Sequence, residues 1–218
     1  RPLSGYDPAT LTAWRDWLGA RGAPNADQAE VPDAASRHAA PFGLLRDPAR
    51  ERPLIDFARF QQEEMADMVL ALAAACRRGT EGKKLVVFFY GYHYEFGPLT
   101  NGAPVAGHYA LGKVLGNPPG SRSKDLDILC SPISYTDRQW PGTAPCMSPA
   151  ESIRDAGIMW LNEDDTRTYL ALEKAYGAVE NLEQTRDVML RNTAQAALRG
   201  FATWWMDLPA EGWFADPA

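Results

Sequence analysis

The sequence has few cysteines, no excess of positive charge and no long apolar run. Its three cysteines, Cys76, Cys130 and Cys146, include no Cys-x-x-Cys pair, which argues against a disulfide scaffold and a zinc or redox motif. The net charge of −6 gives no electrostatic reason to bind nucleic acid or an anionic membrane. No apolar run reaches the roughly 20 residues of a membrane helix. The sequence therefore predicts neither nucleic-acid nor membrane partners.

Two further absences concern phosphate chemistry and location. No glycine-rich nucleotide loop and no Walker sequence follows any strand-like apolar run, so a bound nucleotide is not expected. No other cofactor and no metal is expected either. The first residues, Arg1 to Ser4, contain no apolar signal-peptide core. We interpret Arg1 as a position inside a longer polypeptide, and we favour a secreted or periplasmic location over a cytoplasmic one.

The composition is that of a globular chain with a sizeable core, at 45% hydrophobic and 23% charged residues. Aromatic residues are abundant, with 7 Trp, 8 Tyr and 8 Phe. Such a set suits a sugar-binding surface as well as a core. Cys130 and Cys146 could form a disulfide in an oxidising compartment, but Cys130 ends a predicted strand and is better explained as a small buried residue.

Residues 1–53 are predicted to form one helix and a long excursion. Asp7 is a helix cap, Pro8 suits a first turn, and Leu11, Trp14 and Trp17 fall on one face. Five prolines then follow within residues 23–54, where apolar periodicity is weak. We predict no regular element there.

Residues 54–218 alternate between helical and strand patterns. The predicted helices cover residues 56–79, 105–115, a short stretch from 148, and 179–199; the predicted strands cover residues 84–90, 126–130, 157–161 and 201–205. The first of these strands is a continuous apolar run, as expected for a strand covered on both sides. This alternation predicts a parallel α/β sheet.

Polar and aromatic residues follow the carboxyl end of every predicted strand. They are Tyr92, His93 and Glu95; Ser134, Tyr135 and Arg138; Glu163, Asp164, Asp165 and Arg167; and Trp205 and Asp207. In parallel α/β folds these ends meet at one edge, where ligands bind. We therefore predict a site there.

Structural roles compete with functional ones at several of these positions. Asp164 or Asp165 could cap a following helix, and Arg167 could form a structural ion pair. His93 and His108 are better explained as structural histidines, because no serine or cysteine nucleophile motif accompanies them.

Glu163 is the strongest catalytic candidate. It ends the apolar strand Trp160-Leu161-Asn162, and an adjacent arginine is expected to keep its carboxylate ionised. An ionised carboxylate there could attack or stabilise an oxocarbenium-like centre. We interpret Glu163 as a nucleophile.

Several stretches together carry a family resemblance. They are residues 107–111, 125–135 with Arg138, 147–149, 163–168, and 204–208 with 212–214. In order and spacing they resemble β-galactosidase-like glycoside hydrolases with a clan A (β/α)8 barrel. The likeness extends over residues 54–214, and residues 11–18 and 56–65 resemble the helices after the fourth strand of that barrel.

The resemblance implies that the chain is the C-terminal half of a (β/α)8 TIM barrel, with strands 5 to 8. Glu163 matches the nucleophile after strand 7. The acid/base glutamate follows strand 4 in that family, outside this sequence. The implied activity is retaining hydrolysis of β-linked galactosides or related glycans, without a cofactor.

Within that interpretation, Asp165 and Arg167 orient and ionise Glu163. The sugar subsite is lined by Tyr92, Glu95, Tyr135, Trp205 and Asp207. The missing half of the barrel comes from the same polypeptide or a partner chain. Without it, we expect the chain to self-associate and to be inactive. The alternative is a noncatalytic carbohydrate-binding barrel fragment.

Overall fold

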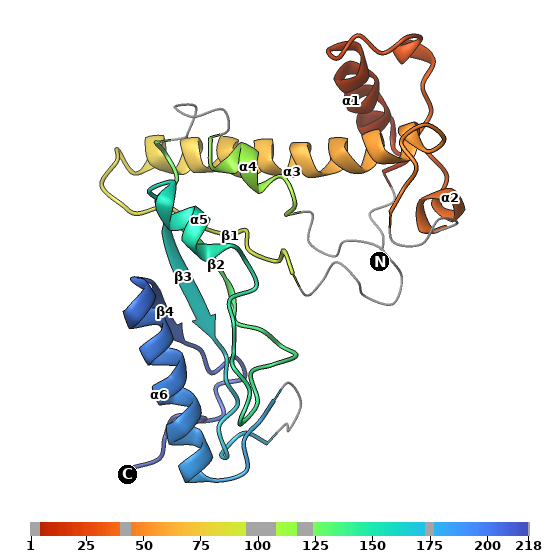
Figure 1. Cartoon of the computed structure of the whole chain (residues 1–218). Helices are drawn as coiled ribbons and strands as arrows, with labels where there is room; N and C mark the ends of the chain where they lie inside the picture. Colours follow the sequence, from red (N-terminus) through yellow and green to blue (C-terminus); the bar gives the residue numbers. More distant parts are fainter. Residues whose placement is uncertain (1–4, 40–44, 95–107, 117–123, 173–176, 218) are drawn as a thin grey trace. The chain divides into compact units, whose positions relative to one another are not determined.

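The structure, a computed structural model, describes residues 5–39, 45–94, 108–116, 124–172 and 177–217 (Figure 1). These residues fall into two compact units. One unit takes its described residues from 1–68 and 96–111, and the other from 69–95 and 112–218. None of the described helices is long and apolar enough to span a membrane.

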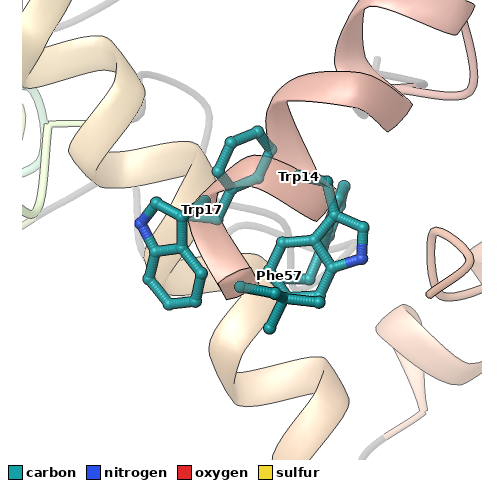
Figure 2. Close-up of a cluster of buried hydrophobic side chains, with 5 residues drawn as sticks. Trp14, Trp17 and Phe57 are labelled. Carbon is teal, nitrogen blue, oxygen red and sulfur yellow. The ribbon is translucent and has the colours of Figure 1, made fainter. Parts of the chain in front are cut away.

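The first unit is built on one helix and the N-terminal part of another, which share an aromatic core. The helix α1, Pro8–Gly19, begins where the Asp7 side chain accepts a hydrogen bond from Thr10 N at 3.0 Å, as the sequence predicts. Trp14 and Trp17 of α1 are buried together with Phe57, and the three rings lie side by side in Figure 2. The Trp14 and Phe57 rings meet edge to face, with centroids 5.3 Å apart.

Phe57 belongs to α3, Arg52–Gly79, a helix of 28 residues. It begins four residues before the predicted start at Asp56: Pro53 fits in its first turn, and Arg52 forms an ion pair with Asp56, one turn on, at 2.7 Å. The predicted domain boundary between residues 53 and 54 therefore falls inside the first turn of a continuous helix.

The proline-rich excursion is more regular than predicted. It contains a short 3-10 helix, η1 (Ala26–Gln28), and a one-turn helix, α2 (Ala34–His38). The Asp33 side chain caps α2 by accepting a hydrogen bond from Ser36 N at 2.8 Å. Capping by a short polar side chain accounts for α2, which lies where apolar periodicity gave no signal; η1 has no such cap.

The second unit contains a four-stranded parallel sheet, which confirms the predicted α/β class. The strands are β1 (Val87–Phe89), β2 (Ile128–Pro132), β3 (Met159–Asp164) and β4 (Ala202–Trp205), paired in chain order. This unit also contains the C-terminal part of α3 and the helices α5 (Ala150–Asp155) and α6 (Leu182–Arg199), with all but the first residue of α4 (Leu111–Val114). Of the helix predicted over residues 105–115, the first three residues lie outside the described part of the chain.

The two faces of this sheet differ in burial. On one face Leu129 and Trp160 are completely buried. The helix α6 packs on this face, where its Asn192 donates a hydrogen bond to Asp164 at 2.8 Å. On the other face Val87 is 46% exposed and Met159 is 48% exposed. Strand register places these two on the same side, since both align with Ile128.

Candidate functional site

Glu163 lies near the carboxyl end of β3, on the sheet face opposite α6. It aligns with Pro132 of β2 and Trp204 of β4, and its side chain is only 7% exposed. The loops after β1 and β2 bring further polar side chains to this edge. Glu163 therefore lies at the edge of the sheet where the sequence analysis expected polar groups to gather.

The proton affinity of Glu163 differs from the prediction. Burial and the negative charge of Asp165 raise its pKa from the ordinary 4.5 to about 7, and the positive charge of Arg138 offsets only part of this rise. The sequence analysis predicted that a neighbouring arginine pairs with Glu163 and keeps it ionised, and this prediction named the wrong carboxylate. The arginines pair with Asp165 instead.

Asp165 is held by two guanidinium groups. Arg138, which is fully buried, donates from Nη1 to Asp165 Oδ1. Nη1 of Arg167 lies 3.8 Å from Asp165 Oδ2. Arg167 also stands over the ring of Trp213, with Cζ 5.1 Å from the ring centroid. Both the functional and the structural interpretation of Arg167 agree with this position.

The two predicted tyrosines of the site lie within range of the charges of the carboxylates. The pKa of Tyr92 rises to about 12 because of burial and the charges of Glu163, Cys130 and Asp165. Burial and Asp165 also raise the pKa of Tyr135. Both phenols therefore keep their protons at neutral pH and can donate hydrogen bonds.

Trp205 does not share the face of Glu163. It aligns with Asp164, whose carboxylate points to α6, and its ring contacts Phe214 at a centroid distance of 5.9 Å. The predicted role of Trp205 in the sugar subsite is thus corrected: the residue that aligns with Glu163 is Trp204, which is 41% exposed. The sequence shows two adjacent tryptophans, and only the strand register decides which one faces the site.

Asp207 serves its own loop. Its carboxylate accepts hydrogen bonds from the backbone N–H groups of Glu211, Gly212 and Trp213, at 3.1, 2.6 and 3.0 Å. These bonds lower its pKa. Its predicted contact with substrate is replaced by this structural role, while Glu95 lies outside the described residues.

Asp164 caps no helix. It accepts hydrogen bonds from Thr166 N at 3.1 Å and from Asn192, and α6 is instead capped by Asn181. The Asp164 carboxylate thereby joins the end of β3 to α6. It forms part of the support beneath the site.

His93 is also structural, as the sequence favours. Ser148 Oγ donates to Gly91 O at 2.5 Å, so it accepts from His93 Nδ1, 2.8 Å away. This pair fixes the loop that carries Tyr92. Gly91 admits no side chain, because a Cβ there would lie 2.6 Å from atoms of Ser131 and Trp160. His108 is buried and lies just outside α4, not within a helix as expected.

One face of α6 anchors the loop between β2 and α5. Asp187 accepts from Trp140 Nε1 at 3.1 Å, Arg191 donates to Gly142 O at 2.5 Å, and Gln195 donates to Thr143 O at 2.5 Å. The three anchors are spaced four residues apart, so they form a single stripe along the helix. This loop carries Tyr135 and Arg138 to the site.

Comparisons with models of protein families, with curated proteins and with solved structures found no match. Within the described part of the chain, no group of histidine, cysteine, aspartate and glutamate side chains is arranged to hold a metal ion. Cys130 and Cys146 are both buried free thiols, so the possible disulfide between them is not formed. The chemistry of the site therefore has to be inferred from its own side chains.

Proposed function

We propose that this chain contributes the nucleophile of a retaining glycoside hydrolase that cleaves β-linked galactosides or related glycans. The observation that carries the proposal is the position of Glu163, a buried carboxyl at the carboxyl edge of a parallel sheet, next to the ion-paired Asp165. Its raised pKa is typical of functional sites, and a pKa of about 7 leaves a large fraction of the carboxyl ionised at neutral pH. Phenol and indole groups beside it suit a sugar ring.

In this mechanism the ionised Glu163 attacks the anomeric carbon while the glycosidic oxygen leaves, which forms a covalent glycosyl-enzyme. Water then attacks the same carbon and releases Glu163. The protonated Tyr92 and Tyr135 donate hydrogen bonds to the carboxylate or to sugar hydroxyls. A second carboxylic acid, ~5 Å from Glu163, must protonate the leaving oxygen. We assign that group to a part of the enzyme outside this sequence.

The partly uncovered sheet face supports a barrel as the complete fold. Parallel sheets are almost always covered on both faces, yet Val87, Phe89, Met159 and Trp204 are each more than 40% exposed. In a closed (β/α)8 barrel these side chains fill the interior. We propose that strands 1 to 4, from the same polypeptide or a partner chain, complete the barrel here.

The test is the variant Glu163→Gln, made in the natural full-length protein or complex that contains these residues. Turnover of an aryl β-galactoside should fall by at least about 10³-fold, since loss of a nucleophile removes the covalent route. The matched control is Glu64→Gln, at an exposed position of α3, which should keep full activity. Undiminished turnover in Glu163→Gln contradicts the proposal. Sugar binding without any turnover in the wild type would favour the noncatalytic alternative.

A further inference from the structure

Arg138 occupies an unusual position for a charged side chain. It is 0% exposed, and its guanidinium meets three acceptors: Asp165, Ile133 O at 2.5 Å and Ser134 O at 2.6 Å. Its Cζ also lies 4.3 Å from the ring centroid of Tyr135. A buried charge is costly unless it is fully paired. The three acceptors therefore fix the position of the Arg138 guanidinium.

The surroundings leave Arg138 little room to move. Gly177 packs against it with a φ of +76°, and a Cβ at Gly177 would approach Arg138 Cγ to 2.8 Å. Arg191 of α6 donates to the backbone carbonyl of Arg138 at 2.8 Å. Gly177 thus limits the room of the Arg138 side chain, and α6 fixes its backbone.

Arg138 is linked to the nucleophile candidate through Asp165. The guanidinium fixes the Asp165 carboxylate, and the charge of that carboxylate acts on Glu163. The titratable and charged groups that act on Glu163 and its two tyrosine neighbours come from three segments: Tyr92 after β1, Cys130, Tyr135 and Arg138 from β2 and its loop, and Asp165 after β3. Arg138 is the cation among them.

We propose that Arg138 is a positioning residue: it fixes the Asp165 carboxylate and the Tyr135 ring beside Glu163, and it supplies the positive charge of this cluster. The catalytic consequence rests on the proposed glycosidase function, in which Glu163 must be ionised to attack. The electrostatic part does not, because it concerns four side chains of this chain alone.

The experiment measures the titration of Glu163 directly, by ¹³C NMR of labelled glutamate carboxyls in the full chain, with the signal assigned by its loss in Glu163→Gln. In Arg138→Met the pKa of Glu163 should rise by about one unit, a tenfold increase in proton affinity, because the offsetting positive charge is gone. Arg138→Lys, which keeps the charge, should restore most of the wild-type value. An unchanged Glu163 titration in a folded Arg138→Met protein overturns the proposal.

Removal of Arg138 leaves the buried Asp165 carboxylate with only the more distant Arg167, and the variant can fail to fold for that reason. Asp165→Asn tests the same link from the carboxylate side, and the amide oxygen of Asn can still accept a hydrogen bond from Arg138, which also keeps Ile133 O and Ser134 O as acceptors. It should lower the pKa of Glu163 by about one unit, because the like charge is lost. An unchanged titration there contradicts the proposal equally.

The acidic limb of the kcat/KM profile provides a second measurement. It should move upward in Arg138→Met and downward in Asp165→Asn, in step with the NMR values. If the NMR values move as expected but the wild-type enzyme has no glycosidase activity, the proposed function fails and the role of Arg138 stands. If the enzyme is active but its Glu163 titration ignores Arg138, only this inference fails.

Discussion

The two faces of the four-stranded sheet come from the same strands but differ in how far they are buried. On the closed face Trp160 is completely buried, and Asp164 is hydrogen-bonded to Asn192 of α6. On the open face, Met159 and Trp204 remain 48% and 41% exposed, and Glu163 has a raised pKa. The closed face, which α6 covers, therefore has the features of a packed core. The open face, opposite α6, combines exposed apolar side chains with a carboxyl of raised pKa.

Within β3, one acidic residue stabilises the fold and its neighbour has the properties of a functional group. Adjacent residues of β3 point to opposite faces, so Asp164 and Glu163 experience different surroundings although they are neighbours in the chain. Asp164 secures α6, and Glu163 keeps an elevated proton affinity that costs folding energy. Such a cost is typical of functional sites rather than of structural ones.

The largest effect should come from the closed face. Trp160→Ala should lower the free energy of unfolding by about 3–5 kcal/mol, because it removes a completely buried indole and leaves a cavity. Urea unfolding followed by circular dichroism measures the change. A loss below about 1 kcal/mol would show that the closed face is not a packed core.

Glu163→Gln should stabilise the protein, and the gain should depend on pH. The folded-state pKa of about 7 exceeds the ordinary 4.5, so the carboxyl holds its proton more tightly in the folded state and ionisation disfavours folding as pH rises from 4.5 to 7. Gln mimics the protonated form, so the gain should be about 3 kcal/mol at pH 8 and near zero at pH 4. Unfolding curves at the two pH values check this. An equal gain at both would contradict the raised pKa.

Gly177→Ala should cost about 2 kcal/mol, since the position has φ of +76° and a Cβ would press on Arg138. Gly200→Ala is the matched control, because its φ of +69° is similar but a Cβ there meets nothing within 4 Å. It should cost about 1 kcal/mol, from backbone strain alone. Thermal unfolding of both variants gives the difference, and equal losses would show that Arg138 is not held by Gly177.

The smallest effect is expected on the open face. Met159→Ala should change the free energy of unfolding of this chain by less than about 1 kcal/mol, because the side chain is already half exposed. The same substitution should cost more when strands 1 to 4 are present and cover Met159. Equal effects with and without them would argue against the proposed barrel.

The sequence predicted the parallel sheet because its strands are short apolar runs between helical patterns, such as the run that ends in Phe88-Phe89-Tyr90. It also predicted that Glu163 and Tyr135 belong to the same edge, since the carboxyl ends of parallel strands meet there. It did not predict that Trp204 rather than Trp205 faces Glu163. A two-residue period has two possible phases, and only strand pairing selects one.

The pairing of Arg138 with Asp165 was likewise beyond the sequence. The two residues are 27 positions apart, and they meet because the loop after β2 folds back against α6 through Arg191. Asp207 was assigned to the site from its position after a strand, yet three nearby backbone N–H groups occupy its carboxylate. Loop hydrogen bonding of this kind has no periodic signature.

The central claim, that Glu163 is a glycosidase nucleophile, is tested most directly by trapping its covalent intermediate. A 2-deoxy-2-fluoro-β-galactoside with an activated leaving group forms the glycosyl-enzyme of a retaining enzyme but slows its hydrolysis. Mass spectrometry of the peptides from the inactivated natural protein should find the fluorosugar on Glu163, and none in Glu163→Gln. A fluorosugar on any other residue, or full activity after incubation of a protein that hydrolyses the unsubstituted galactoside, would contradict the account.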